Sequence, residues 1–335
     1  MFELRIRVWY RIRFTISGEI MATTKTKMIS YQSCLGIQNR KPTEDLKQPT
    51  TPYYAALARD ELTYEAFKAD NIDIDNAMMP SRRQGVDLLS STVAHSLWST
   101  QDRLTAYCIS GNDLCKLNTD YSLSVILYGV GSAPMVFQEV PGLILYTNGR
   151  VNGFIQDNVA YPIPDTTQQF RIKLPAGQCM EYYRGRVYVG SGSVIWFSDA
   201  FRFFRLDGRR NFKQFPDEID LMAATTDGIY VACGGITYFM EGVNPHKFEL
   251  RPVAGYGAYR NTRRLISGEK IGNGGITEDV AIWTGEEGIC CGMPAGKLLN
   301  ITMEKYKMPS GLVATSLVVP DTPNGNYAQY ITIIK

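Results

Sequence analysis

The chain has 335 residues, of which 44% are hydrophobic, and its 20 Tyr, 14 Phe and 4 Trp exclude disorder as its main state. Its 35 Lys and Arg nearly balance 33 Asp and Glu, and this net charge of +2 argues against a protein that coats nucleic acid, which needs a basic excess. No apolar run approaches the roughly 18 residues that cross a bilayer, so we expect no membrane partner.

The start of the chain carries an Arg-rich alternating segment. Residues 2–16 alternate Arg with large apolar side chains, as a two-faced strand does, and they lack the compact apolar segment of a secretory signal. Gly18 and Glu19 lie just before Met21, and this dipeptide can be encoded by a purine-rich ribosome-binding sequence. We therefore hypothesise that Met21 is the natural start and that residues 1–20 are an over-extended leader.

Residues 21–70 are predicted to form an N-terminal arm that is mostly extended, because the stretch up to residue 51 is polar and contains proline. One short helix is expected over residues 52–69, where apolar side chains form a partial stripe. The stripe consists of Tyr54, Leu57, Ala58, Leu62, Ala66 and Phe67.

The segment that starts at Asn71 superficially resembles a calcium-binding loop. Asp73 and Asp75 alternate with isoleucine, but Asn76 stands where the loop requires glycine, and Arg82 stands where it requires a terminal glutamate. We therefore predict a polar edge strand here and no metal site.

A repeat with a period of 43 residues is the main signal beyond residue 90. Three predicted hairpins align by their first glycine, at Gly142, Gly185 and Gly228, which are 43 residues apart. Short Val, Ile, Tyr and Phe runs alternate with Gly, Asn, Asp and Pro, which is typical of strands joined by turns. The return strands of the second and third hairpins carry the aromatic pairs Trp196-Phe197 and Tyr238-Phe239. Looser copies occur at residues 104–117, 279–291 and 312–334.

This period predicts an all-β fold, a single β-propeller of five or six blades over residues 71–335. A propeller blade of four strands takes about 40–45 residues, and blades bury their faces by packing against one another. The aromatic pairs would fill the space between blades, and the C-terminal strand ending at Ile334 would pair with an early strand to close the ring. An all-β sandwich and an irregular array of hairpins remain as alternatives.

Side chains that carry catalysis or bind metals are few. There are two histidines, His95 and His246, and the sequence holds no Cys-x-x-Cys and no Gly-x-Ser-x-Gly motif. Asp217, Glu218 and Asp220 are carboxylates that could pair for acid–base chemistry. We predict that the protein is not an enzyme, with no catalytic residues, no cofactor and no metal ligands.

The seven cysteines are scattered, which favours a reducing compartment and a role as small buried hydrophobic residues. Because Cys290 and Cys291 are adjacent, a strand would direct them to opposite faces, where they could not bind one ion together. The seven are Cys34, Cys108, Cys115, Cys179, Cys233, Cys290 and Cys291.

Residues 199–216 concentrate Arg and Phe, and we predict that they form an excursion on one rim of the ring. Arg with aromatic side chains is the composition of protein-interface hot spots. It also occurs where polynucleotides bind, and buried Phe with exposed Arg is a third interpretation. Arg82-Arg83 and Arg263-Arg264 would add charge to the rim. The predicted interface residues are Arg202, Phe203, Phe204, Arg205, Arg209, Arg210 and Phe212.

Several framework segments together resemble virion structural proteins of tailed bacteriophages, from about residue 70 to the end. These segments are Asn71-Ile-Asp-Ile-Asp75, Ser81-Arg-Arg-Gln-Gly85, Ala94-His-Ser-Leu-Trp98, Tyr182-Tyr-Arg-Gly-Arg-Val-Tyr-Val189, Val194-Ile-Trp-Phe-Ser-Asp199, Asn211-Phe-Lys-Gln-Phe-Pro216 and Asp227-Gly-Ile-Tyr-Val231. The resemblance implies a β-propeller-like protein built into the virion, since short-tailed phages use propellers in the tail nozzle or hub.

On this interpretation the chain is a non-enzymatic component of the tail, in the nozzle, hub or adaptor region, and assembles through contacts of the propeller rim. Expected partners are other virion tail proteins and further copies in a homo-oligomeric ring, with genomic DNA nearby but not specifically bound. The expected location is the virion, after synthesis in the bacterial cytoplasm. The alternative is a propeller that binds or hydrolyses glycans at the host surface, for which acidic and aromatic side chains would converge on the mouth of the central channel.

Overall fold

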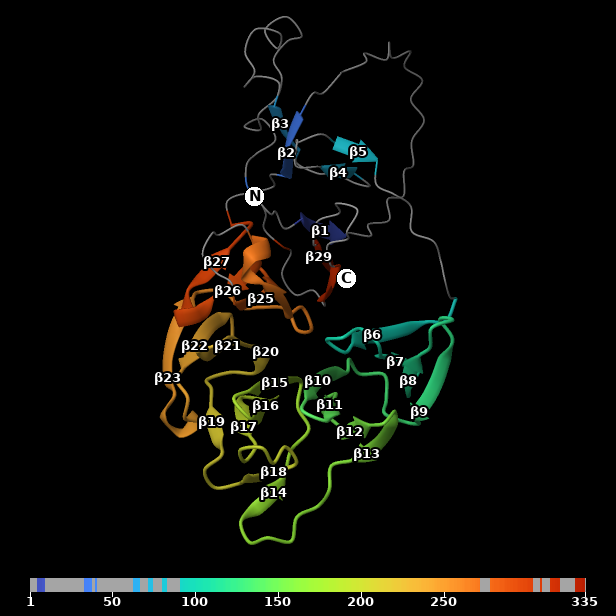
Figure 1. Cartoon of the computed structure of the whole chain (residues 1–335). Helices are drawn as coiled ribbons and strands as arrows, with labels where there is room; N and C mark the ends of the chain where they lie inside the picture. Colours follow the sequence, from blue (N-terminus) through green and yellow to red (C-terminus); the bar gives the residue numbers. More distant parts are fainter. Residues whose placement is uncertain are drawn as a thin grey trace, which may run out of the picture.

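The computed structural model (Figure 1) describes residues 91–271 and 278–303, together with Arg40, Met308 and short strands elsewhere in the chain. This part of the chain is built from β-strands, with 3-10 helices of three or four residues between some of them. The predicted all-β class is therefore confirmed. In the described residues, no helix is long and apolar enough to cross a membrane.

Five four-stranded antiparallel sheets follow one another along the chain, and in each the strands lie side by side in chain order. The first two sheets are β6 (Ala94–Ser99), β7 (Ala106–Ser110), β8 (Asp113–Leu117) and β9 (Leu123–Leu127), then β10 (Val136–Val140), β11 (Leu143–Thr147), β12 (Asn152–Gln156) and β13 (Val159–Pro162). The third is β15 (Cys179–Tyr183), β16 (Arg186–Ser191), β17 (Val194–Phe197) and β19 (Phe212–Gln214). The last two are β20 (Ile219–Ala224), β21 (Gly228–Cys233), β22 (Ile236–Glu241) and β23 (Glu249–Ala254), then β24 (Arg264–Ser267), β25 (Asp279–Gly285), β26 (Gly288–Gly292) and β27 (Leu298–Asn300).

The 43-residue repeat corresponds to the second strands of neighbouring sheets, β11, β16 and β21. Gly142 and Gly185 lie in the turns before these strands with φ of 87° and 76°, a backbone conformation that glycine adopts without steric cost. Gly228 differs, because it lies inside β21, where the Phe239 ring packs so closely that a β-carbon would clash. The repeated glycines therefore serve two different purposes.

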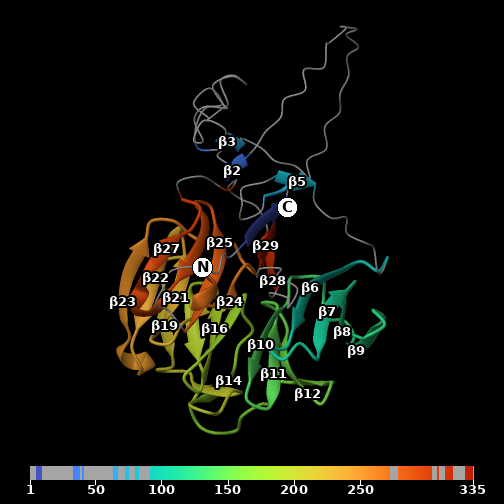
Figure 2. The same cartoon turned by 45° about the horizontal axis from the view of Figure 1, so that its top comes forward.

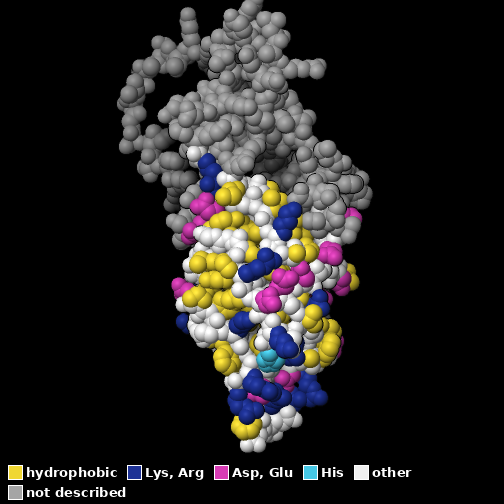
Figure 3. Space-filling model, turned by 90° about the vertical axis from the view of Figure 1, so that its left-hand side faces the viewer, with side chains coloured by type: hydrophobic (Ala, Val, Ile, Leu, Met, Phe, Trp, Pro, Cys, Tyr) yellow, Lys and Arg dark blue, Asp and Glu magenta, His cyan; other side chains and the backbone are white. Residues whose placement is uncertain are grey.

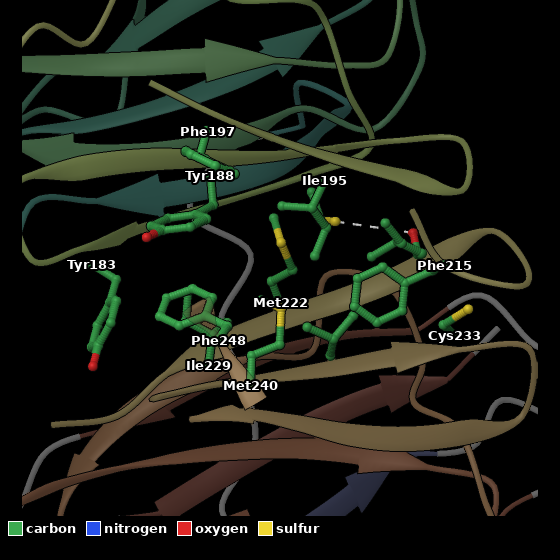
Figure 4. Packing of buried hydrophobic residues seen from close by; sticks show 13 residues of the cluster. Tyr183, Tyr188, Ile195, Phe197, Phe215, Met222, Ile229, Cys233, Met240 and Phe248 are labelled. Carbon is green, nitrogen blue, oxygen red and sulfur yellow. Dashed lines mark hydrogen bonds between the residues drawn. The ribbon is translucent and has the colours of Figure 1, made fainter. Parts of the chain in front are cut away.

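Consecutive sheets pack face to face and share a hydrophobic cluster at each junction. Separate clusters join the first sheet to the second, the second to the third, the third to the fourth and the fourth to the fifth. Figure 4 shows the third junction, where Tyr188 and Ile195 of the third sheet point toward Met222 and Met240 of the fourth. The five sheets are thus stacked face to face in the order in which they occur in the chain.

Adjacent residues of one strand point to opposite faces of the sheet, so they belong to the two hydrophobic clusters on either side of it. Trp196 faces the second sheet, whereas Phe197 faces the fourth. Likewise Cys290 belongs to the junction with the fourth sheet and Cys291 to the junction on the other side of the fifth. The predicted burial of these two cysteines on opposite faces is confirmed.

The first strands lie toward the middle of the stack. β10, β15 and β20 lie next to one another, while the fourth strands β13, β19 and β23 lie at the periphery (Figure 1). Figure 2 shows the same sheets in a view in which they stand beside one another.

The C-terminal hairpin is also found, as β28 (Ala314–Val319) and β29 (Gln329–Ile334). It packs on the fifth sheet through a shared cluster that includes Tyr330. β29 also pairs in parallel with β1 (Arg5–Trp9), so the C-terminal strand has an early partner, which lies within the segment hypothesised above to be a leader and outside the predicted propeller.

The N-terminal expectations are met only in part. β3 (Thr63–Ala66) is a strand that pairs in parallel with β2 (Ser33–Ile37), so the predicted helix over 52–69 is wrong at these four residues and its remainder lies outside the described residues. A strand partner outweighed the partial apolar stripe. The predicted polar edge strand is present as β4 (Ile72–Ile74), which pairs with β5 (Pro80–Arg82) apart from the four-stranded sheets.

Candidate protein interface

Two short strands outside the five sheets form a projecting ribbon, which we call the β14–β18 ribbon. β14 (Arg171–Lys173) belongs to the connection between the second and third sheets, and β18 (Arg205–Asp207) belongs to the excursion between β17 and β19. They pair antiparallel at the lower end of the molecule in Figure 1. The Arg- and Phe-rich segment is therefore an inter-strand excursion, as predicted, but its last part is the fourth strand of the third sheet.

Asp207 and Asp199 organise the arginines of the ribbon. The carboxylate of Asp207 lies 3.3 Å from Nε of Arg209 and 3.5 Å from Nε of Arg210, and its side chain is only 4% exposed. Nη1 of Arg171 lies 3.0 Å from Asp199 Oδ1 and 3.8 Å from Asp207 Oδ2, so one guanidinium bridges both carboxylates.

Hydrogen bonds from Arg209, through its side chain and its backbone N–H, lower the pKa of Asp207 to about 2. Asp207 therefore stays ionised at any physiological pH and holds the turn that follows β18. The turn is closed further by the backbone N–H of Asn211, which donates to the carbonyl of Asp207 over 2.9 Å.

The segments that form the ribbon carry more basic than acidic side chains. The two segments that carry the ribbon, residues 165–173 and 199–215, together hold seven Lys and Arg against three Asp and Glu, whereas the whole chain carries a net charge of +2. The side chains of Arg209 and Arg210 are 56% and 70% exposed despite their contacts with Asp207. Figure 3 shows Lys and Arg gathered at this end of the molecule.

Apolar side chains are exposed among these cations. The Arg209 guanidinium lies over the Phe170 ring, 3.7 Å from its centroid, in a cation–π contact, while its Nε and Nη2 donate to Asp207. Phe170, Ile172 and Phe201 are 50%, 42% and 75% exposed. Large exposed apolar groups next to arginines are typical of protein interfaces.

The structure divides the predicted interface residues into two groups. Arg202, Arg205, Arg209 and Arg210 lie on or beside the β14–β18 ribbon, and Phe212 is 43% exposed on β19, where its ring lies 5.5 Å from that of Trp196.

Phe203 and Phe204 are partly buried and pack inward rather than standing in solvent. Phe204 packs on Phe154 with 4.6 Å between ring centroids, and Phe203 meets Tyr182 edge-on at 5.8 Å. Both rings contact the cluster between the second and third sheets, because the excursion folds back over that junction. Phe215, at the end of the segment, is also buried, in the next junction.

Sequence reasoning missed the β14 side of the surface, which supplies Phe170, Arg171 and Ile172. These residues lie outside the excursion in the chain, and the pairing of β14 with β18 brings them beside it. The available signal was a short alternation of Arg, Ile and Lys in an otherwise polar connection.

A second ionic group lies at the first strands of the sheets. Nη2 of Arg263, just before β24, donates to Glu181 of β15, whose side chain is 2% exposed. Burial raises the pKa of Glu181, and Arg263 opposes that shift. Arg263 therefore does not add charge to the rim as expected. Burial also lowers the pKa of the neighbouring Arg264 to about 10.

The carboxylates considered for acid–base chemistry are engaged in ion pairs or turns. Arg260 Nη2 lies 2.9 Å from Glu218 and 3.0 Å from Asp220. Asp217 Oδ1 accepts the backbone N–H of Glu218 at 2.7 Å.

His95 lies on β6 beside Ser96, and burial lowers the pKa of its imidazole. Across the described part of the chain, no group of three or more His, Cys, Asp and Glu is placed to hold a metal ion.

Comparisons with known proteins give only distant similarities of fold. No family model and no curated protein matches the chain. Among solved structures, it is similar to the extracellular domain of the hybrid two component system BT4673 from B. thetaiotaomicron, at 11% identity and a TM-score of 0.47, covering 70% of this chain and 30% of that one.

Two further similarities are to Saccharomyces cerevisiae Sqt1 and to the WD40 domain of Neurospora crassa Pan2. They show 10% identity and a TM-score of 0.39 each, covering 71% and 68% of this chain and 66% and 83% of theirs. The chain spans only 30% of the length of the first two structures that it matches.

Proposed function

We propose that the chain is a six-bladed β-propeller that serves as a non-enzymatic structural component of a tailed-phage virion. The five four-stranded sheets would be five blades, and β28 and β29 with β1 would complete the sixth. Support comes from the hydrophobic clusters, which join each sheet to the next and the fifth sheet to the C-terminal hairpin.

The observation that carries the assembly role is the β14–β18 ribbon. It projects from the stacked sheets and combines exposed Arg209 and Arg210 with exposed Phe170, Ile172 and Phe201. Such a surface suits a permanent contact with a neighbouring protein, because apolar groups give buried area and arginines give directional hydrogen bonds. Together with the resemblance of the framework segments, it favours the phage tail, where the neighbours would be other tail proteins and further copies of this chain.

The glycan-hydrolysing alternative requires a carboxylic acid and a carboxylate that act on a sugar. Among the carboxylates discussed above, Glu181, Glu218 and Asp220 are each held by an arginine, and Asp199 and Asp207 organise the ribbon. Their ion pairs give them structural roles, so the structural proposal is better supported than glycan hydrolysis, and this argument does not bear on glycan binding.

Purified phage particles test this proposal. Mass spectrometry should find the chain in the particle, and the double variant Arg209→Glu/Arg210→Glu should be strongly depleted from particles while it still unfolds cooperatively, at a somewhat lower melting temperature because both arginines contact Asp207. The control Arg103→Glu/Arg150→Glu makes the same charge change at exposed turns elsewhere and should be incorporated normally. Absence of the wild-type chain from particles, or equal incorporation of both variants, would contradict the proposal.

A further inference from the structure

β14 has one edge that no described residue pairs with. Gly208 N–H donates to Phe170 C=O over 3.2 Å, and Leu174 N–H donates to Phe204 C=O over 2.8 Å. In an antiparallel pair, alternate residues direct their peptide groups to the partner, so Arg171 and Lys173 direct theirs away from β18. Arg171 N–H donates to the carbonyl of Gln168 over 3.0 Å. The carbonyl of Arg171 and both peptide groups of Lys173 are left without a partner among the described residues.

The opposite edge of the ribbon is closed. Asp199 N–H donates to the carbonyl of Arg205 over 3.0 Å, and Arg205 N–H reaches the carbonyl of Arg202 over 3.4 Å. A turn of the same excursion therefore occupies the outer side of β18, and β14 alone can accept another strand.

The open edge is also accessible. The side chain of Lys173 is 54% exposed, and that of Ile172 lies partly in solvent over Gly208. An exposed edge strand is a template for a further strand, and lysine on such an edge disfavours pairing with a second copy of the same edge. The edge is therefore better suited to pair with a strand of different sequence than with β14 of a second copy of this chain.

The charges around the edge specify an acidic partner. Lys173 pairs with Asp165 over 2.9 Å, but Asp165 is 86% exposed, so this pair contributes little and can be exchanged. Arg209 and Arg210 add positive charge that Asp207 only partly balances. An incoming strand with carboxylates at alternate positions would replace Asp165 and engage the arginines.

We infer that β14 accepts an extended acidic segment of another protein as an added strand, which names the partner class of the proposed interface and rests on that proposal. A peptide strand can form hydrogen bonds with the free peptide groups of Lys173 and can pack on the aliphatic side chain of Ile172. A polynucleotide uses the cations alone, so the observations favour a protein.

The full chain and a synthetic peptide, acetyl-Glu-Val-Glu-Val-Glu-Val-amide, provide the test. We expect saturable binding that is at least tenfold weaker for the same peptide N-methylated at alternate residues, because N-methylation removes the donors of strand pairing. The peptide with Lys in place of Glu should not bind. Equal binding of the methylated and unmethylated peptides would overturn strand addition.

Two variants of Lys173 separate the contribution of its backbone N–H to binding from that of its side-chain charge. Lys173→Gln removes the charge only and should weaken binding a few-fold, whereas Lys173→Pro also removes the outward N–H and should abolish binding. That N–H takes no part in the pairing with β18, and proline is tolerated on edge strands, so the melting temperature should change little. Equal binding of the two variants would overturn the inference, as would tighter, competing binding of an oligothymidylate.

The particle and peptide experiments together distinguish failure of the proposed virion role from failure of the strand-addition inference. If particles exclude the Arg209→Glu/Arg210→Glu variant but the peptide does not bind, the interface stands and strand addition is wrong. If the peptide binds with the expected pattern but particles do not contain the chain, the acidic-strand site stands and the virion role is wrong.

Discussion

Asp207 is a single buried carboxylate that fixes the position of several arginines. Its oxygens lie close to Arg171, Arg209 and Arg210, and these contacts join β14 to the turn after β18. A depressed pKa is a statement about stability, because the folded state binds the proton less readily than the unfolded state does.

The pH dependence of Asp207 follows from that shift. Its pKa of about 2 in the fold lies below the ordinary value near 4, so its contribution is complete above pH 4 and is lost as the pH falls toward 2. We expect Asp207→Asn to lower the free energy of unfolding by a constant amount above pH 4 and by progressively less toward pH 2. Urea titrations of both proteins over this range measure the difference, and a difference independent of pH would contradict the assignment.

Gly185 supports the exposed ring of Phe201. Its φ of 76° disfavours any side chain, and a β-carbon there would meet the Phe201 ring at 2.7 Å. We expect Gly185→Ala to destabilise the protein by about 1 kcal/mol, from backbone strain, because the largely exposed Phe201 ring can move aside. Gly192→Ala is the matched control, because its φ is 60° and its surroundings are open, and a similar loss is expected. A markedly larger loss for Gly185→Ala in chemical denaturation would show that the Phe201 ring is held in place.

At the scale of elements, the excursion between β17 and β19 is partly surface and partly core. Leu206 of β18 is fully buried, and Phe204 packs on Phe154. Deletion of residues 200–215 would therefore remove core side chains and the strand β19, and we expect loss of cooperative folding rather than a selective loss of assembly.

Single substitutions separate the two roles of the excursion. Phe204→Ala should cost about 2 kcal/mol of unfolding free energy, because its partly buried ring packs on Phe154, whereas Phe201→Ala should stay within about 0.5 kcal/mol because its ring is largely exposed. Phe201→Ala should nevertheless reduce incorporation into particles. Thermal melts and particle composition measure the two effects, and the opposite order of stabilities would place Phe201 in the core.

At the scale of the whole molecule, the ion pair of Glu181 and Arg263 connects the third sheet to the fifth. The two residues lie 82 positions apart and meet beside the first strands of these sheets. Glu181 is buried, so its charge is tolerated only with its partner in place, and removing one member of such a pair is more damaging than replacing both.

We expect Arg263→Met to destabilise the protein by about 3 kcal/mol at neutral pH, and the double variant Glu181→Gln/Arg263→Met to recover part of that loss. Burial raises the pKa of Glu181, and without Arg263 that pKa rises further. The folded form of Arg263→Met then gains stability as the pH falls and Glu181 takes up a proton. Urea unfolding between pH 8 and pH 5 measures this, and a loss that grows toward acid would contradict it.

Local patterns were enough to predict most of the hairpins, their spacing and the faces on which neighbouring residues lie. Hairpins and alternation are local properties, so the 43-residue period, the paired aromatics and the opposite burial of Cys290 and Cys291 could all be predicted. The three-dimensional structure was needed to show which arginines meet carboxylates, that Phe203 and Phe204 turn inward, and that β14 pairs with β18. Those contacts join segments distant in the chain, and their geometry depends on how whole sheets stack, which no local pattern encodes.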